Sequence, residues 1–396
     1  MRIGDYCSVK SGYAFESSQF ESNGIPVIRI SDIQDSRVHT ENSVRVQEFS
    51  LDGDYVLQTG DFVIAMSGAT TGKIGMYRNP HISYVNQRVG KFIVKDKEQL
   101  YPDYLYHAMN SKNFGNQLAK VLEQGAQPNI SSRLIESFLI SVPDSILEQE
   151  AIAEALSDID ELIETLKQEI DKKVNLLRAL SQKLVPWTFL TSLPSGWSLV
   201  TLGDSGTISG AGVDKVFRAD ETEVTLINYM DVYRNDGLSK ELNFSKTTAT
   251  AKQISNCSLR EKDVLFTPTS ETPEDIARSS VIVNDIPNAV YSYHLIRFRP
   301  NRQFDLNYLK HVFDIYDFRS QVRKSAEGSG TRYVITLPRF RSLAIPVPNL
   351  STQSYIGSIL DEASTEIKKL GIELGKYERL KQGMMNDLLT GKVRLV

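Results

Sequence analysis

The sequence predicts an α+β protein in which two tandem related domains are joined by two long antiparallel coiled-coil helices. Three observations predict this fold. The sequence repeats itself with a period near 204 residues, each copy opens with a strand-rich part, and each copy ends in a long stretch with apolar residues at coiled-coil spacing.

The composition is that of an ordinary globular protein. The chain has 396 residues and a formal net charge of −4, from 45 Lys and Arg against 49 Asp and Glu. This length predicts two or three folding units. No segment is basic enough to identify a nucleic-acid binder by charge alone, and none argues against one.

The expected location is the cytoplasm, with no membrane as a partner. The beginning of the sequence lacks the basic and apolar segments of a signal peptide, and no apolar stretch is long enough to span a membrane. Two cysteines are too few for a disulfide framework or a cysteine zinc site.

The internal repeat is carried by short motifs that keep their order and spacing. So many matches in one register predict two copies of one domain rather than a solenoid, which needs at least three repeats. The matching pairs, first copy then second, are Gly4-Asp5 and Gly203-Asp204, Gly60-Asp61 and Lys262-Asp263, Tyr104-Leu105 and Tyr308-Leu309, Val142-Pro143 and Val347-Pro348, and Gln149 and Gln353.

Within each copy, strand-like runs come first and a helix and a glycine-rich loop follow. The first copy contains three β-branched or aromatic runs, Ile25–Ile33, Phe62–Met66 and Lys91–Val94. Apolar spacing predicts one helix over Pro102–Leu122 and its counterpart over Leu306–Lys324. The loops that follow are residues 123–130 and 327–334.

Each copy ends in a helix with an a/d seam. Ser145 and Glu148 have the spacing of a capping box, while Pro186 and Gly391 are the expected helix ends. The two seams are expected to bury each other in antiparallel orientation, because one strand-rich domain separates them. The seam residues are Ile152, Leu156, Ile159, Ile163, Leu166, Ile170, Val174, Leu177, Leu180 and Leu184, then Ile356, Leu360, Ala363, Ile367, Leu370, Leu374, Tyr377, Leu380, Met384 and Leu388.

The expected domains are therefore residues 1–147 and 187–350, with long helices over residues 148–186 and 351–396. At 1.5 Å per residue, such a helix is about 55 Å long.

A search for catalytic chemistry finds none. The Ser67–Lys73 segment resembles a phosphate loop but has the wrong glycine spacing, and Ile74 stands where Ser or Thr should bind magnesium. The five histidines form no metal-binding pattern. We therefore predict no catalytic residues and no metal ligands, and the residues alone describe a two-headed binding protein.

The duplicated pattern resembles one family over nearly the whole chain, the specificity (S, or HsdS) subunits of type I restriction–modification systems. The features that carry the resemblance are Leu193-Pro-Ser-Gly-Trp197 before Leu202-Gly203-Asp204, Gly60-Asp61, both long helices, and the final Leu388-Leu-Thr-Gly-Lys-Val-Arg394. One departure is that the first copy lacks the Leu-Pro-x-Gly-Trp segment.

The resemblance implies that each strand-rich part is a target-recognition domain that reads half of a split double-stranded DNA site. The helices would space the halves and dock two modification (M) subunits, which bind S-adenosylmethionine and methylate adenine N6. Two restriction (R) subunits would use ATP and Mg for translocation and cleavage. The chain itself would bind no cofactor and carry no catalysis.

Base reading needs donors and acceptors on exposed loops. Three places per copy qualify on residue type. The first is the loop over Ser67–Lys73, with its counterpart over Thr267–Arg278, and the second is the glycine-rich loop. The third is the edge around Lys10–Tyr13 and Gln87-Arg88. The candidate DNA-binding residues are Lys10, Tyr13, Thr70, Thr71, Lys73, Gln87, Arg88, Gln124, Gln127, Asn129 and Ser131 in the first copy, and Thr269, Ser270, Arg278, Ser329, Thr331, Arg332 and Tyr333 in the second.

Two other functions stay open on the sequence. A bivalent adaptor could grip protein partners with its two heads, and linkage would raise its avidity. An enzyme, either a methyltransferase or a nuclease, could carry an unrecognised site.

Overall fold

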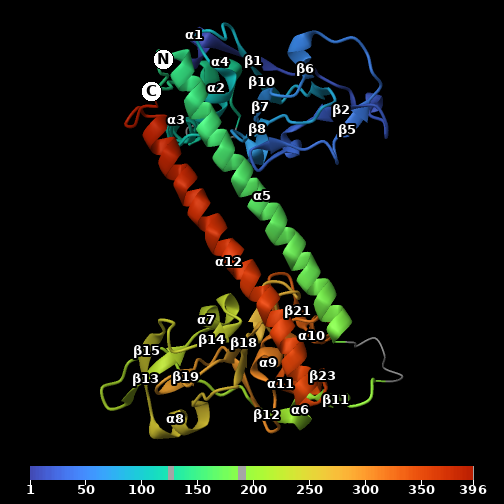
Figure 1. The fold of residues 1–396 in the computed structure, drawn as a ribbon, viewed down its shortest axis with the longest axis vertical. Coiled ribbons are helices and arrows are strands. Elements are labelled where there is room, and N and C mark those ends of the chain that lie inside the picture. Colours follow the sequence, from blue (N-terminus) through green and yellow to red (C-terminus); the bar gives the residue numbers. More distant parts are fainter. Residues whose placement is uncertain (124–128, 186–192, 396) are drawn as a thin grey trace. The chain divides into compact units, whose positions relative to one another are not determined.

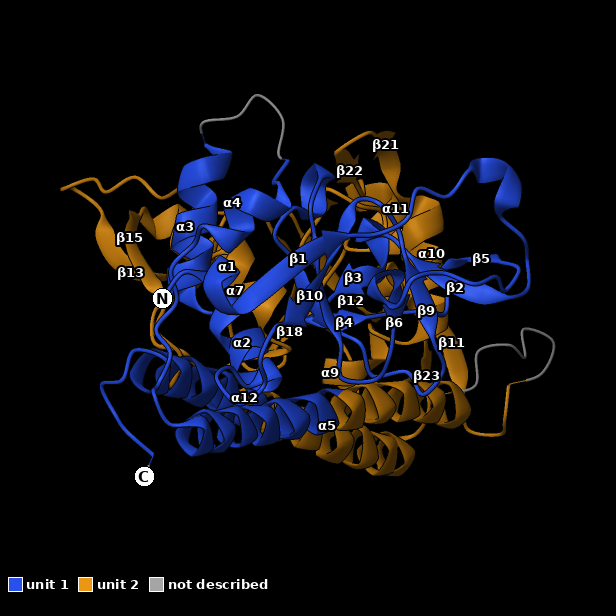
Figure 2. Cartoon of the chain, turned by 90° about the horizontal axis from the view of Figure 1, so that it is seen from above, with its two compact units in different colours: residues 1–167, 373–396 blue, residues 168–372 orange. Residues whose placement is uncertain are grey.

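The computed structural model describes residues 1–123, 129–185 and 193–395. The chain divides into two compact units (Figure 2). Unit 1 comprises residues 1–167 and 373–396, and unit 2 comprises residues 168–372. Each long helix is therefore divided between the two units.

Unit 1 is built on two sheets, and Figure 1 shows them in blue. The six-stranded sheet has the order β1 (Cys7–Ser11), β10 (Val89–Val94), β7 (Phe62–Ala65), β8 (Ile74–Met76), β4 (Arg37–Val38) and β3 (Ile33–Gln34). The four-stranded sheet has the order β5 (Val44–Val46), β2 (Ile25–Ile28), β9 (Ser83–Val85) and β6 (Val56–Leu57).

The helices of unit 1 cover the larger sheet. They are α1 (Ile3–Tyr6), α2 (Pro102–Met109), α3 (Lys112–Leu122), α4 (Ser132–Glu136), the first part of α5 (Ile146–Leu184) and the last part of α12 (Leu350–Leu388). The prediction of one helix over Pro102–Leu122 is wrong. The chain breaks at Asn110 and Ser111, because the Ser111 side chain caps a new helix by accepting a hydrogen bond from the Phe114 N–H.

The described residues of unit 2 form four sheets. The largest has the order β12 (Gly206–Ser209), β20 (Ile296–Pro300), β16 (Val264–Phe266), β18 (Ser279–Ile282) and β14 (Gly237–Leu238). The others are β15 (Ser245–Ala249), β13 (Thr222–Ile227) and β19 (Ala289–Tyr291); β17 (Thr269–Ser270), β22 (Arg332–Val334) and β21 (Glu327–Ser329); and β11 (Ser198–Thr201) with β23 (Ala344–Val347).

Two expectations for unit 2 need correction. The helix expected over Leu306–Lys324 is two helices, and the expected loop at 327–334 is a hairpin, because β21 and β22 pair with each other and β22 pairs with β17. The helices are the last part of α5, then α6 (Leu202–Ser205), α7 (Tyr229–Arg234), α8 (Ala251–Cys257), α9 (Leu306–Val312), α10 (Tyr316–Ser325), α11 (Leu337–Ser342) and the first part of α12 (Leu350–Leu388).

The repeated aspartate has the same role in both units. Asp61 accepts a hydrogen bond from the N–H three residues before it and pairs with Lys91 at 2.8 Å. Asp263 repeats the backbone contact and pairs with Arg299 at 2.7 Å. The residue before each aspartate has a positive φ, +94° in unit 1 and +67° in unit 2.

Other repeated side chains fasten each domain to its long helix. The hydroxyl of Tyr104 donates to the Ser141 carbonyl at 2.8 Å, and that of Tyr308 donates to the Pro346 carbonyl at 2.6 Å. Both tyrosines are buried. Each ties a short helix to the segment that leads into the long helix.

The repeated glutamine completes this joint. Gln149 of α5 accepts a hydrogen bond from the Tyr101 N–H at 2.8 Å and donates to the Pro143 carbonyl at 2.9 Å. Gln353 of α12 makes the equivalent two bonds, at 3.0 and 2.8 Å. The repeat in the sequence is therefore a repeat of buried polar contacts as well as of apolar residues.

The prediction of antiparallel long helices is confirmed in each unit. In unit 1, the start of α5 lies beside the end of α12, and ion pairs join Asp160 to Lys381 and Lys167 to Glu378. In unit 2, the end of α5 lies beside the start of α12, and a 2.8 Å ion pair joins Lys173 to Glu366. Residue numbers increase along α5 while those of the paired residues on α12 decrease, as expected for two antiparallel helices (Figure 1).

The apolar seam is buried where the helices meet a domain and open where they do not. Ile152 and Leu156 in unit 1, and Ile356 and Leu360 in unit 2, are at most 2% exposed. Two residues predicted to lie in the seam are exposed, Val174 at 36% and Leu380 at 48%. A pair of helices has no third neighbour to cover these positions.

The end of the chain folds back onto the first turn of α5. The Glu148 carboxylate is 5% exposed, and both of its oxygens accept hydrogen bonds from Arg394, one of them at 2.6 Å. The capping box expected from Ser145 and Glu148 stays a prediction, and the structure adds an ion pair between this carboxylate and Arg394 that the sequence analysis did not foresee. The Arg394 hydrogen bond lowers the pKa of Glu148, and a backbone hydrogen bond from Leu395 adds to the effect.

This contact gives a pH-dependent prediction. Because the folded pKa of Glu148 is lowered, the stabilisation is complete above the ordinary glutamate pKa and is lost as the pH falls through the folded value. Arg394→Ala should lower the melting temperature at pH 7, and the difference from the parent chain should shrink below about pH 4. Lys392→Ala, which removes a more exposed pair with Asp387, is the control and should cost less. A difference that is independent of pH would contradict the ion pair.

Candidate nucleic-acid interface

In unit 1, the three predicted places lie side by side at one edge of the six-stranded sheet. β1 and β7 end at this edge, and β10 and β8 begin there, because neighbouring strands are antiparallel. The Gln87 N–H donates to the Tyr13 carbonyl, the Met66 N–H donates to the Arg88 carbonyl, and the Ile130 N–H donates to the Met66 carbonyl, each at 2.9 Å. Three loops far apart in the sequence thus form one surface, which we call the unit 1 edge.

Among the exposed candidate side chains of the unit 1 edge are Lys73, Gln87, Arg88 and Asn129. They offer two cationic groups and two amides, which are the groups that read guanine and adenine in a major groove. Gln124 and Gln127 lie outside the described residues.

Other candidates on this edge already have structural partners. The Thr70 hydroxyl donates to the Ile30 carbonyl at 3.2 Å, and the Thr71 hydroxyl donates to the Gly68 carbonyl at 2.7 Å. The Ser131 hydroxyl caps α4. These three side chains shape the loops.

Lys10 and Tyr13 also have neighbours. Lys10 lies 3.7 Å from the Asp54 carboxylate, and both side chains are exposed. The Tyr13 ring is 37% exposed and packs edge-on against Phe15, with 5.0 Å between ring centroids, and also against Phe49. The ring therefore offers one side to solvent while the other is part of an aromatic cluster.

In unit 2, the candidate residues gather on a small sheet that has no described equivalent in unit 1. Thr269 pairs with Val334 and Ser270 pairs with Tyr333, so the loop after β16 joins the β21–β22 hairpin. Ser329, Thr331 and Arg332 lie exposed around the hairpin tip, and Tyr333 is half-buried. We call this surface the unit 2 hairpin.

Arg278 closes the loop that contains β17. Its guanidinium lies 3.0 Å from the Asp275 carboxylate, and 45% of its side chain is exposed. The Arg278 hydrogen bond lowers the pKa of Asp275. The Arg278 guanidinium is therefore fixed at the surface by its ion pair with Asp275.

The sequence interpretation missed Tyr293 and His294 in unit 2. They follow β19 as Gln87 and Arg88 follow β9, and the bridge between Tyr13 and Asn86 recurs between Val213 and Ser292. Tyr293 is 54% exposed and packs on His294, with 3.9 Å between ring centroids. The repeat was the available signal, because the run from position 85 to 89 aligns with positions 291 to 295.

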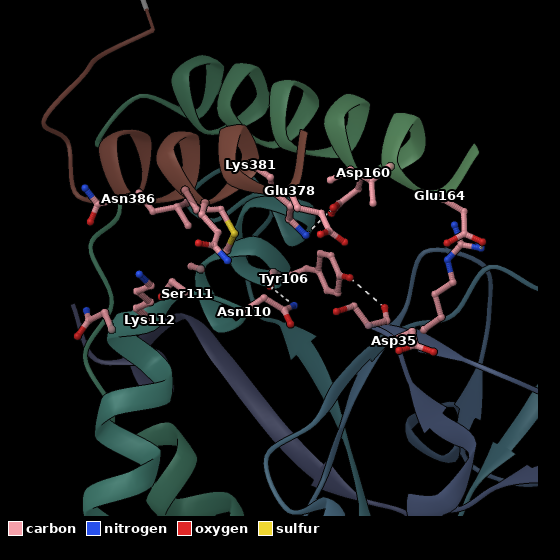
Figure 3. A pocket seen from close by; sticks show the side chains of 18 of the residues that line it. Asp35, Tyr106, Asn110, Ser111, Lys112, Asp160, Glu164, Glu378, Lys381 and Asn386 are labelled. Atoms are coloured by element: carbon pink, nitrogen blue, oxygen red, sulfur yellow. Dashed lines mark hydrogen bonds and ion pairs between the residues drawn. The ribbon is translucent and has the colours of Figure 1, made fainter. Parts of the chain in front are cut away.

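A pocket of about 650 Å³ lies in unit 1 between the β3–β4 turn, the α2–α3 break and the two long helices (Figure 3). Its walls carry ion pairs that join these elements. Arg37 of β4 lies 3.4 Å from Glu164 of α5, and Lys381 of α12 pairs with Asp160 of α5. The Tyr106 hydroxyl donates to the Ser36 carbonyl at 3.0 Å. These contacts around the pocket hold the sheet against the helices of unit 1.

Within the described ranges, no group of three His, Cys, Asp or Glu side chains could hold a metal ion. In the same part of the chain, no helix is both long and apolar enough to cross a membrane.

Comparisons with known proteins give a consistent result. The family model described as the type I restriction modification DNA specificity domain matches residues 1–175 and again residues 194–374. The chain is 31% identical over 177 residues to the type I restriction enzyme MjaVIII specificity subunit of Methanocaldococcus jannaschii, which is 43% of this chain and 41% of that protein.

A second relative and a solved structure match over nearly the whole chain. The StySPI specificity subunit of Salmonella potsdam is 23% identical over 390 residues, covering 93% of this chain and 82% of that protein. The fold is similar to the crystal structure of the type I restriction–modification S subunit from M. genitalium, with a TM-score of 0.62, 14% identity, and coverage of 98% and 95%.

The unit 1 edge depends on a close backbone approach at Gly12. A Cβ there would lie 2.1 Å from the Val85 carbonyl oxygen, so Gly12→Ala should shift the strand end and lower the free energy of unfolding by about 1–3 kcal/mol. Gly53→Ala is the control, since a Cβ at Gly53 meets nothing within 4 Å. Denaturant unfolding measures both variants, and equal stability of the two would contradict the packing described.

Proposed function

We propose, since the chain belongs to the type I restriction–modification DNA specificity family, that its two units read the two halves of one split, asymmetric DNA site. The chain acts as the specificity subunit of a type I restriction–modification enzyme and leaves catalysis to its partners. This role directs adenine methylation and ATP-dependent restriction to the chosen site.

The observation that carries the proposal is that the two units share their internal contacts but expose different side chains at the edge of the main sheet. Both units keep the same aspartate, tyrosine and glutamine contacts, so the framework that joins the main sheet to the long helix is shared. At the corresponding edge, however, unit 1 exposes Gln87 and Arg88 where unit 2 exposes Tyr293 and His294. Equal frameworks with different donors and acceptors suit two readers of different sequences.

The long helices support a spacing and docking role. Several large apolar side chains on them are exposed, namely Leu162 at 38%, Leu176 at 58%, Tyr355 at 63% and Ile372 at 73%. Such side chains on a helix suit burial against partner subunits. We assign this surface to two M subunits, which bind S-adenosylmethionine and methylate adenine N6.

In this scheme the helix pair also sets the gap between the two half-sites. Two R subunits, with ATP and Mg, complete the restriction enzyme. Phosphate contacts shared with the M subunits account for a net charge of only −4 in a chain that binds double-stranded DNA.

Exchanging one domain tests the proposal. The full chain is expressed with its M subunit in a methylation-free host, and N6-methyladenine is mapped across the genome. Replacing residues 1–147 with the equivalent domain of another family member should change one half of the methylated motif and leave the other half unchanged, because each unit carries its own edge.

The reciprocal exchange of residues 187–350 is the matched control and should change the other half. A change in both halves from a single exchange would contradict modular reading. Methylation that is independent of this chain would contradict the specificity role itself.

A further inference from the structure

Helix α7 in unit 2 exposes side chains that its fold does not require. Met230 is 44% exposed and Tyr233 is 40% exposed, and Arg234 beside them is also exposed. Val232, on the opposite side of the helix, is 1% exposed and packs into the core. The exposed side of α7 is therefore an apolar and basic surface whose side chains lie outside the core of the unit.

This surface is fastened to the candidate interface of unit 2. The Tyr229 hydroxyl donates to the Thr269 carbonyl of β17 at 2.7 Å. The Tyr229 and Tyr233 rings are stacked, with 6.0 Å between centroids and 16° between planes. Because β17 pairs with the β21–β22 hairpin, α7 and the hairpin are two parts of one connected surface.

Unit 1 contains the same element with different chemistry. In unit 1 the Asp32 carboxylate accepts from the Arg29 N–H at 2.9 Å, and in unit 2 the Asp231 carboxylate accepts from the Asn228 N–H at 2.7 Å. The segment in unit 1 is also tied to its neighbouring loop, through the hydrogen bond from Thr70. There, however, the exposed residues that correspond to Met230 and Tyr233 are Ser31 and Gln34, and neither is aromatic. The framework position is duplicated and the exposed tyrosine is particular to unit 2.

We propose that α7 is a further DNA-reading element, in which Tyr233 and Met230 contact bases of the half-site read by unit 2. The inference rests on the proposed function of the chain. The base faces of a duplex are already stacked on one another, so an exposed tyrosine ring packs on a sugar or on the methyl group of thymine at a base edge. The methionine side chain suits the same methyl group. Arg234 lies where it can pair with a phosphate, and Tyr229 acts as a positioning residue by holding the ring against β17.

The test uses the full chain in complex with its M subunit. Methylation mapping of the parent complex identifies the split motif, and a duplex that carries this motif is the probe for binding. Tyr233→Ala should weaken binding about tenfold or more, and the methylated motif should become degenerate in the unit 2 half alone. Tyr233→Phe keeps the ring and should bind within about threefold of the parent.

Leu199→Ala is the matched control, because Leu199 is also 40% exposed in unit 2 but lies on β11, which pairs with β23. It should leave both affinity and motif unchanged. Met230→Ala is a second variant, which should make the methylated motif degenerate at only part of the same half-site. It replaces Tyr233→Ala as the test if Tyr233→Ala has a much lower melting temperature than the parent.

Parent-like affinity and an unchanged motif in both alanine variants of α7 would overturn this inference while leaving the proposed function intact. Equal losses in Tyr233→Ala and Leu199→Ala would overturn it as well, because the effect would then follow from any exposed apolar residue. If the parent complex shows no sequence preference for any duplex, the proposed function fails and the inference fails with it.

Discussion

The antiparallel pairing of α5 and α12 is the constraint on which the rest of the molecule depends. Each unit takes one part of each helix, and unit 1 is assembled from two separate pieces of the chain, residues 1–167 and 373–396. In unit 1, Arg394 pairs with Glu148, although all of unit 2 lies between these two residues in the sequence. In unit 2, Lys173 and Glu366 bring the end of one helix to the start of the other. Folding of either unit therefore requires the helix pair to be in register.

Duplication explains how one chain supplies two different surfaces on one scaffold. The contacts that build a domain are buried, such as the Asp263–Arg299 pair, and these recur in both units with little change. The outer side chains of the loops at the sheet edge, and of the segment that contains Tyr233, face solvent. These side chains are therefore not needed to build the core. Selection for a new sequence preference can therefore change these loops without disturbing the core.

Sequence reasoning predicted the duplicated architecture and the two long helices because apolar spacing and matched motifs follow directly from packing. It failed where a local hydrogen bond decided the structure. The Ser111 cap breaks a helix whose apolar spacing is continuous, and no sequence pattern indicates that Arg394, far along the chain, pairs with Glu148. Among the candidate site residues, the pattern indicated the loops but not that the Thr70 and Thr71 hydroxyls are used internally. Tyr293 was missed although the internal repeat aligns it with Gln87.

The central claim is that the helix pair sets the distance between two DNA-reading surfaces. The most direct measurement inserts four residues into each long helix and maps N6-methyladenine produced by the complex with the M subunit. The insertion lengthens each helix by about 6 Å, close to two base-pair steps of about 3.4 Å. The account predicts the same two half-sites with a gap that is one or two base pairs wider. Methylation of the original motif with an unchanged gap would contradict it.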